Sequence, residues 1–197
     1  MLKNRINILS EIRKVSDLKD ILFDKSFLKN TPNFIVYKVT RGISHKNGLR
    51  YDETVILPKL LGKEFPKTKG HEHPKKCIEL IKVLKGKAIF LLQKDEKDII
   101  KDIYFIKAKA GQCLISPAEY SHTTINASNK ELKIGTWIDN RYPSDYSNIK
   151  KFKGFGYYHT ILGWQKNKNY KKVPKLKEKK PLKLFPKNLK FLKNCCS

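Results

Sequence analysis

The sequence predicts an all-β fold, built as an antiparallel sandwich or barrel, and two observations predict it. Short runs rich in β-branched and aromatic residues follow one another from residue 34 to residue 138. Gly, Pro, Asp and Lys-rich turns separate these runs at a spacing of roughly 8–12 residues, which is typical of sandwiches and barrels. We therefore expect many short strands around one core.

The expected elements follow in chain order. Residues 2–28 carry apolar side chains at helical or mixed spacing, with Ser16 and Asp17 as the expected N-cap. Residues 34–39 form the first expected strand, and Pro58 ends a second at 54–57. The later expected strands are residues 78–84, 88–93, 99–106, 113–116, 123–126, 132–138 and 154–164, with 170–173 as a partner for the last.

The chain divides into three expected parts. Residues 1–30 form a short, partly helical N-terminal extension packed on the barrel, and residues 31–174 form the barrel itself. Residues 175–197 hold eight Lys and one Glu, interrupted by Pro181 and Pro186, and contribute +7 to the net charge of +25. This Lys-rich stretch predicts a tail that is flexible or draped on the surface.

The composition limits the classes of partner and the location that we expect for the protein. With 40% hydrophobic residues in 197, the chain can bury a core, and no run approaches the roughly 18 apolar residues of a membrane span. Because residues 1–12 lack the apolar core of a signal peptide and four Cys do not form a disulfide framework, we expect a cytoplasmic protein. Of the 43 basic residues only five are Arg, which disfavours a nucleic-acid partner. Abundant Lys, Asn and Ile are instead typical of an AT-rich genome.

Three histidines and one glutamate form a candidate metal site. His71 and His73 are two residues apart, so on a strand their imidazoles point to the same face. Glu79 follows six residues later and His122 lies beyond Pro117. Three imidazoles and a carboxylate suit one divalent first-row metal, such as Fe, Mn, Ni or Zn. The other two histidines, at 45 and 159, are expected to be ordinary structural residues.

The residues around this site resemble the two motifs of the cupin superfamily. In the first motif, two His and a Glu precede a glycine turn, here at Gly86. In the second, Gly111, Pro117 and His122 precede Asn126. The resemblance implies a cupin fold, a jelly-roll-like barrel. Glu119 stands where the second motif usually has Gly, so this turn must form without glycine's freedom at positive φ.

Further segments resemble the cupin-type glucose-6-phosphate isomerases, a metal-dependent family first associated with archaea. The likeness spans residues 12 to 174. The matching segments are residues 12–18, 36–37, 54–55, 63–65, 67–74, 83–87, 91–93, 121–126, 145–146 and 154–155.

The resemblance implies a function. It implies interconversion of glucose 6-phosphate and fructose 6-phosphate by a homodimer that binds one divalent metal. Glu79 becomes the candidate base if the reaction passes through an enediol, with a hydride shift as the other route. The residues implied to bind the phosphorylated sugar are Tyr37, Thr54, Thr68, Gly70 and Tyr146.

Several positions depart from the family pattern. Ile81 replaces an expected Tyr, Ser144 replaces an expected His, and Ile138 lies near another missing Tyr, a space that Trp137 or Tyr142 could fill. These changes leave two alternatives open. One is a cupin that isomerises another sugar phosphate, and the other is a cupin that binds a sugar phosphate without catalysis. Apolar side chains lining the pocket at these positions would weaken the catalytic interpretation.

Overall fold

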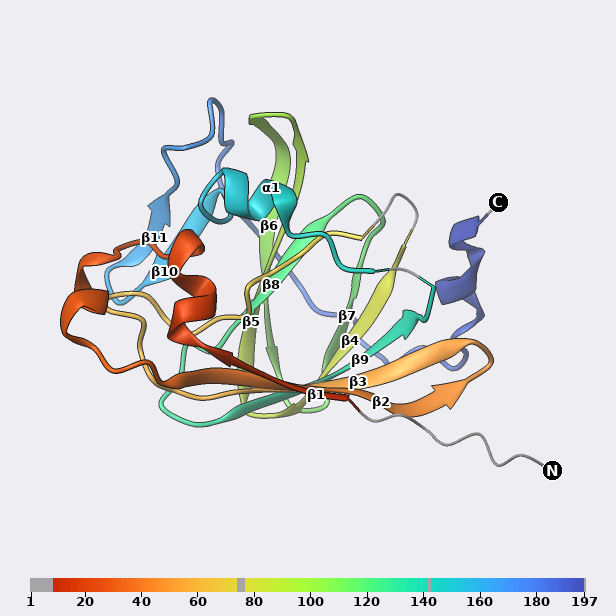
Figure 1. The fold of residues 1–197 in the computed structure, drawn as a ribbon. Coiled ribbons are helices and arrows are strands. Elements are labelled where there is room, and N and C mark those ends of the chain that lie inside the picture. The colour runs from red at the N-terminus through yellow and green to blue at the C-terminus, as the bar shows by residue number, and fades with distance from the viewer. Residues whose placement is uncertain (1–8, 74–76, 142, 197) are drawn as a thin grey trace.

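Two β-sheets face each other in the computed structural model, which describes residues 9–73, 77–141 and 143–196 (Figure 1). The first sheet has the strand order β1-β2-β3-β9-β4-β7, and the second has the order β12-β6-β5-β8. The strands are β1 (Leu9–Lys14), β2 (Ile35–Lys46), β3 (Leu49–Ile56), β4 (Glu79–Lys85), β5 (Lys87–Glu96), β6 (Ile99–Lys109), β7 (Cys113–Ser116), β8 (Ser121–Ile125), β9 (Leu132–Asp139), β10 (Tyr157–Thr160), β11 (Gly163–Lys166) and β12 (Lys177–Lys179).

Nearly all neighbouring strands are antiparallel, as an all-β sandwich requires. Only β12 runs parallel to its neighbour, β6. The strands β10 and β11 form a separate hairpin. The helical segments are short: η1 (Val15–Ile21), η2 (Ser26–Asn30), α1 (Ser147–Lys151) and η3 (Lys190–Cys196). The all-β fold of antiparallel sheets expected from the sequence is therefore confirmed.

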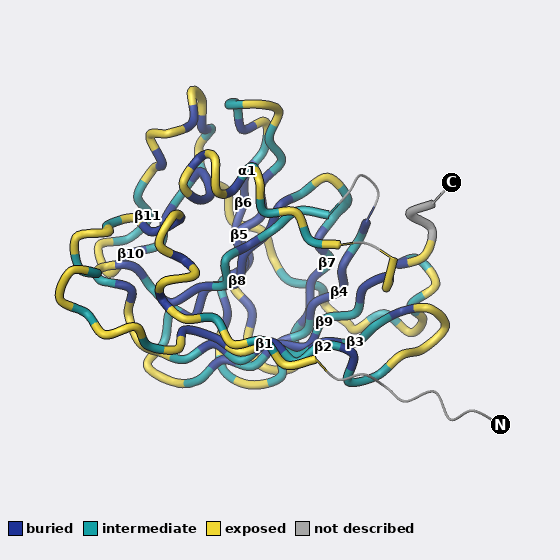
Figure 2. Tube along the Cα trace, in the orientation of Figure 1, coloured by how far each residue is buried: buried dark blue, intermediate teal, exposed yellow. Residues whose placement is uncertain are grey.

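The core lies between the two sheets, where β-branched and aromatic side chains of alternate strand residues meet. Phe90, Leu92 and Val83 are fully buried there. Figure 2 shows the buried positions gathered along the facing strands, with exposed positions in the loops. No helix among the described residues is long and apolar enough to cross a membrane.

The N-terminal extension differs from the helical expectation. Residues 9–14 form the edge strand β1, which pairs with β2, and only then does the chain turn into η1. Asp17 lies within η1, and its carboxylate accepts a hydrogen bond from the Lys14 amide at 2.7 Å. Asp17 therefore caps η1 from a position within the helix, whereas the sequence predicted an N-cap at Ser16 and Asp17.

The C-terminal elements also differ in detail. The expected strand at 154–164 is a hairpin whose arms are β10 and β11, and residues 170–173 form no strand of their own. The tail lies on the barrel: β12 extends the second sheet, and Leu192 is fully buried beside Leu49 and Leu80. The Lys-rich composition did not indicate these contacts, because the pairing of β12 and the burial of Leu192 both depend on the tertiary fold.

The turn before His122 has a backbone conformation that is costly for the residue it contains. Glu119 has φ 65°, in the left-handed region that glycine adopts most easily. A non-glycine residue there costs roughly 1–2 kcal/mol. The turn therefore keeps its geometry without the glycine that the cupin pattern usually has.

Candidate active site

Residues 66–71 run alongside β8 and carry the first histidine into the space between the sheets. Thr68 donates its amide to the Thr124 carbonyl, while the His71 and His122 backbones exchange two hydrogen bonds. Three residues on one side therefore face two on the other, which is a β-bulge. Gly70 occupies the bulge with φ 72°, and a Cβ there would lie 2.3 Å from the Phe155 ring.

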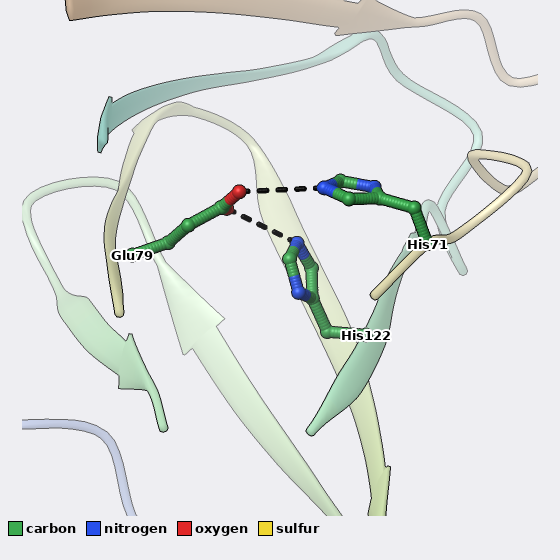
Figure 3. Close-up of side chains that lie close together, drawn as sticks. All are labelled: His71, Glu79 and His122. Atoms are coloured by element: carbon green, nitrogen blue, oxygen red, sulfur yellow. Dashed lines mark hydrogen bonds and ion pairs between the residues drawn. The ribbon is translucent and has the colours of Figure 1, made fainter. Parts of the chain in front are cut away.

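The four candidate metal ligands come from both sheets and meet in one place. Glu79 is the first residue of β4, and His122 lies on β8 in the opposite sheet. Figure 3 shows the Glu79 carboxylate between the His71 and His122 rings. The distances from its oxygens to their Nε2 atoms are 3.3 Å and 3.2 Å. The donor atoms of these three residues lie within 4.8 Å of one another.

His73 completes the cluster. Its Nε2 lies 2.8 Å from the Nε2 of His71 and is hydrogen-bonded to Glu79. The carbonyl of Pro143 can only accept a hydrogen bond, so Nδ1 of His73, 3.0 Å away, carries the proton. With Nδ1 protonated, Nε2 faces Glu79: it donates to the carboxylate when the ring is protonated, and it would be the metal-binding atom when the ring is neutral.

A similar contact orients His122. Its Nδ1 lies 3.1 Å from the Ser116 hydroxyl, which leaves Nε2 directed at the Glu79 carboxylate. Metal-binding histidines commonly use their second nitrogen in this way, because the outer contact fixes both the tautomer and the ring orientation. Two of the three rings are thus held with Nε2 toward the common point.

The protonation states of the cluster suit a cation. Burial lowers the pKa of His71 to about 4, so its ring is neutral at pH 7. Burial alone would raise the pKa of Glu79, but His122 and His73 hold it well below its ordinary value. Burial lowers the pKa of His73, and Glu79 outweighs that effect and raises it. A neutral His71 ring and an ionised Glu79 carboxylate are the forms in which these side chains bind a divalent metal, and a bound cation would replace the proton that Glu79 favours on His73.

A cavity opens beside the cluster, and the residues implied to bind substrate line it. These are Tyr37, Thr54, Thr68, Gly70 and Tyr146. Tyr37 is buried, and its hydroxyl accepts a hydrogen bond from the Lys69 amide at 3.2 Å, while burial raises its pKa to about 12. The Tyr146 ring lies 6.0 Å from the His71 ring. The sequence-based set thus shares one cavity, although the role of each residue stays a prediction.

The two threonines differ in their partners. The Thr68 hydroxyl accepts the Thr124 amide at 3.0 Å and lies 3.1 Å from the Thr123 hydroxyl. The Thr54 hydroxyl and the Gly70 amide have no hydrogen-bond partner within the described part of the chain. Thr54 and Gly70 are therefore the freer donors, while Thr68 also holds the strand pairing together.

The lysines near Thr68 take different directions. Lys67 is buried away from the cavity, where its ammonium contacts Glu64 at 2.5 Å and the Ile21 carbonyl at 2.8 Å. The ammonium of Lys69 lies 5.0 Å from the centre of the Tyr146 ring. Only Lys69 therefore brings its charge near the lined cavity.

The departures from the family pattern also reach the cavity. Ile81, Ile138 and Ser144 all line it. Trp137 stacks at 5.0 Å with Tyr51 and packs with the cluster around Leu80 instead, while Tyr142 lies outside the described residues. The wall beside the cluster is consequently apolar at Ile81 and Ile138.

Sequence reasoning missed three charged residues of the cavity, namely Arg41, Arg50 and Asp52. The signal for them was present, because alternate residues of a strand share a face. Arg50 and Asp52 precede Thr54 by four and two residues on β3, and Arg41 follows Tyr37 by four residues on β2. The predictions of Thr54 and Tyr37 as cavity residues therefore extended to all three.

The chain is similar to several known proteins. The chain resembles an oxalate oxidase in complex with glycolate (17% identity, TM-score 0.47, covering 62% of this chain and 60% of that one). A family model described as "Glucose-6-phosphate isomerase (GPI)" matches residues 12–175.

Curated relatives carry the same description. A glucose-6-phosphate isomerase of Thermococcus kodakarensis is 32% identical over 151 residues, covering 73% of this chain and 76% of the relative. One of Thermococcus litoralis is 31% identical over 157 residues, covering 76% and 79%. The similarity therefore extends over most of both chains and includes the segments that form the cavity.

Proposed function

The chain belongs to the glucose-6-phosphate isomerase family, and from that membership we propose that it interconverts glucose 6-phosphate and fructose 6-phosphate with one bound divalent metal. One observation carries the proposal. The three-histidine, one-glutamate cluster lines the same cavity as two hydrogen-bond donors without a partner among the described residues, the Thr54 hydroxyl and the Gly70 amide. Such a reaction needs both a centre for the C1 and C2 oxygens and a hold on the phosphate.

The metal would be held by His71, His73, Glu79 and His122. Bound there, it would polarise the C1 and C2 oxygens of the sugar and fix their position. The chain's own contribution is to orient the ligand atoms, through the Ser116 and Pro143 contacts. The donor set suits Fe, Mn, Ni or Zn.

The phosphate end would lie at Thr54, Thr68 and Gly70. A hydroxyl and an amide without protein partners are suited to phosphate oxygens, because hydrogen bonds to charged groups are stronger than neutral ones. Tyr37 and Tyr146 would line the sugar between this end and the metal. The high positive charge of the chain would draw the dianion inward, an effect that weakens with salt.

The hydrogen transfer has two routes. In the enediol route, Glu79 would take a proton from one carbon and return it to the other. Its ionised carboxylate is available for this, although contacts with three imidazoles make it a weak base. In the hydride route, Glu79 would act only as a ligand. Solvent exchange of the transferred hydrogen in deuterated water distinguishes the two.

A coupled assay tests the proposal. The protein is stripped with a chelator, reloaded separately with Fe, Mn, Ni or Zn, and supplied with fructose 6-phosphate. Formation of glucose 6-phosphate that depends on the added metal is the expected result. Absence of turnover with every metal, in protein shown to contain it, would contradict the proposal.

The apolar wall favours a second candidate. Ile81 and Ile138 offer no hydroxyl donors to a polyol, so a different sugar phosphate, or binding without turnover, fits this wall better. Assay of other aldose and ketose phosphates under the same conditions separates these possibilities. Faster turnover of another sugar phosphate would change the substrate, and tight binding without any turnover would make the protein a binding module.

We also propose a homodimer. The outer face of β1 and the start of β2 expose Ile12 and Ile35, at 50% and 39%, which is typical of a surface that another chain covers. Light scattering would measure the mass in solution, and a monomer at micromolar concentration would contradict the proposal.

A further inference from the structure

A charged triad on β2 and β3 faces the cavity. Asp52, only 5% exposed, lies between two guanidinium groups. Arg50 donates from Nε to both Asp52 oxygens at 2.9 and 3.0 Å, and Arg41 contacts Asp52 at 3.4 Å. The Gly42 amide donates to the same carboxylate at 2.9 Å. Asp52 therefore holds Arg50 at a cavity wall, while Arg41 divides its contacts between Asp52 and Glu11.

Arg50 is held in place with donors to spare. Besides Asp52, its side chain contacts Asn140 through Nη1 at 3.3 Å, and it remains 20% exposed. A guanidinium carries five N–H groups, so several face no protein acceptor among the described residues. Arg41 is less free, because its Nε is bound by Glu11 at 2.9 Å.

Sheet register places Arg50 beside the metal cluster. Arg50 pairs with Ile138 on β9, and Leu80 pairs with Trp137, so Glu79 lies across from Ile138 on its other side. Two strand spacings of about 4.8 Å separate Arg50 from Glu79 on one face. Thr54 lies four residues along β3, about 13 Å away at the strand rise. Arg50 thus lies at the cluster end of the cavity, away from Thr54, whose hydroxyl is proposed for the phosphate.

The neighbouring wall is apolar. Ile81 and Ile138 line the cavity beside this charge and offer it no hydrogen-bond acceptor. A fixed guanidinium in such surroundings interacts strongly with an oxygen that carries or develops negative charge.

We propose that Arg50, oriented by Asp52, binds the C1-end oxygen of the sugar phosphate and selects ligands that carry negative charge at that end. This inference rests on the proposed function, since it assumes a phosphorylated sugar in this cavity. Arg50 then supplies this end of the ligand with the hydrogen-bond donors that the apolar wall lacks. Both a substrate oxygen that gains charge during isomerisation and the carboxylate of a sugar acid fit the same group.

Two probes differ only at this end: 6-phosphogluconate, with a carboxylate at C1, and glucitol 6-phosphate, with a neutral alcohol. Calorimetry measures the affinity of the metal-loaded protein for both. The parent protein should bind 6-phosphogluconate more tightly. Arg50→Gln should weaken it tenfold or more and glucitol 6-phosphate less than threefold, with unchanged metal content. Arg50→Lys, which keeps the charge but loses the fork, should give an intermediate loss.

Lys133→Gln is the matched control. It removes one positive charge from the same sheet, where Lys133 pairs with Glu53, and neither residue lines the cavity. Its affinities should equal those of the parent. An equal loss of both probes in Arg50→Gln, or no loss, would overturn the inference, as would failure of the parent to bind either. If Arg50→Gln does not fold, the same comparison in Arg50→Lys decides. Binding of both probes without turnover of fructose 6-phosphate would contradict the proposed function alone.

Discussion

The Nε2 atoms of His73 and His122 are directed at Glu79 by contacts on the far sides of their rings. Ser116 and the Pro143 carbonyl provide these contacts to Nδ1, and each leaves the Nε2 atom of its ring to face Glu79. Ligand geometry is therefore set by residues that would not themselves touch a metal. At the scale of single residues, this makes the cluster sensitive to two kinds of substitution with different magnitudes.

We expect His122→Ala to lose most of the bound metal, because one of four donor groups disappears. Ser116→Ala keeps all donors but frees the His122 ring, and it should weaken metal affinity roughly 10–100-fold. Competition with a chelator measures both. His159→Ala is the control, since His159 stacks between Phe65 and Trp164 rather than facing the cluster. Full metal content in His122→Ala would exclude that residue as a ligand.

Thr54→Val tests the phosphate end. The change keeps the side-chain shape and removes a hydroxyl that has no partner among the described residues. Loss of a hydrogen bond to a charged group costs about 1.5–3 kcal/mol, so KM for fructose 6-phosphate should rise roughly ten- to a hundredfold. Metal content should not change. An unaltered KM would mean that the phosphate binds elsewhere.

Thr68→Val should raise KM similarly, but it also removes the acceptor of the Thr124 amide. Its thermal stability should fall as well, because a buried amide loses its partner. Comparison of the two variants therefore separates a binding role from a structural one.

At the scale of elements, the site depends on how the chain enters the barrel. Lys67 and Glu64 form a buried ion pair directly before the histidines, and their side chains are 6% and 1% exposed. Glu64 also accepts the Phe23 amide at 3.0 Å, and Lys67 donates to the Ile21 carbonyl. This pair ties the N-terminal extension to the segment that becomes the bulge at Gly70.

Glu64→Gln should be strongly destabilising. It leaves the Lys67 ammonium buried without its counter-charge, which typically costs about 3–5 kcal/mol of unfolding free energy. Adding Lys67→Met should recover much of that loss, because no buried charge remains. Urea unfolding measures both. Glu131→Gln breaks the exposed pair with Lys85 and should cost about 0–1 kcal/mol. Equal effects of the two single changes would argue against a buried pair.

The sequence predicted those elements whose signal is local. The strands from β2 to β9 are runs of β-branched and aromatic residues bounded by turns, and all appear. Most boundaries lie within three residues of the expected ones, but β2 ends seven residues later and β3 begins five residues earlier than expected. The edge strand β1 and the strand β12 carry no such signal, since Lys, Glu and Ser dominate them. Their conformation comes from pairing with β2 and β6, which sequence reasoning does not see.

The site divides in the same way. The histidines and Glu79 could be predicted because their spacing is characteristic, and the substrate residues because a family resemblance carried them. Arg50 and Asp52 are ordinary charged residues in a chain rich in charge. The alternation from Thr54 indicated that they face the cavity. The register of β3 against β9 then places them relative to the other cavity residues.

At the scale of the whole molecule, the tail joins parts that are distant in sequence. β12 extends the second sheet, the Leu182 amide bonds the Cys113 carbonyl, and Leu192 packs beside Leu80. These contacts lie on the outside of the barrel, since none of the tail residues that the structure describes lines the cavity beside the histidine cluster. The tail should therefore contribute to stability rather than to chemistry.

Removal of residues 175–197 should lower the melting temperature and leave kcat/KM for fructose 6-phosphate within a few-fold of the full chain. The milder change Leu192→Ala should cost about 2–5 kcal/mol, because it opens a cavity at a fully buried position. Calorimetry and the coupled assay measure the two effects. Abolished turnover in a truncated protein that still folds and binds metal would show that the tail serves the active site.

The attachment of the tail should depend on pH. Lys177 donates to Asp102 on β6 at 2.8 Å, and this contact lowers the pKa of Asp102 below its ordinary value of 3.8. The folded carboxylate thus holds its proton less tightly than the unfolded one. The resulting stability is present above pH 3.8 and is lost as the pH falls through the lowered folded pKa.

We therefore expect Asp102→Asn to lower the melting temperature at pH 7 and to match the parent at pH values below the lowered pKa of Asp102. Lys177→Met should behave in the same way, and the double variant should lose less than the sum of the two, because both remove one contact. Part of the Asp102 effect should remain in Lys177→Met, since Tyr120 also donates to this carboxylate at 3.0 Å. Thermal unfolding at each pH gives the comparison. A constant difference between Asp102→Asn and the parent from pH 7 down to the acid limit would show that the ion pair does not fasten the tail.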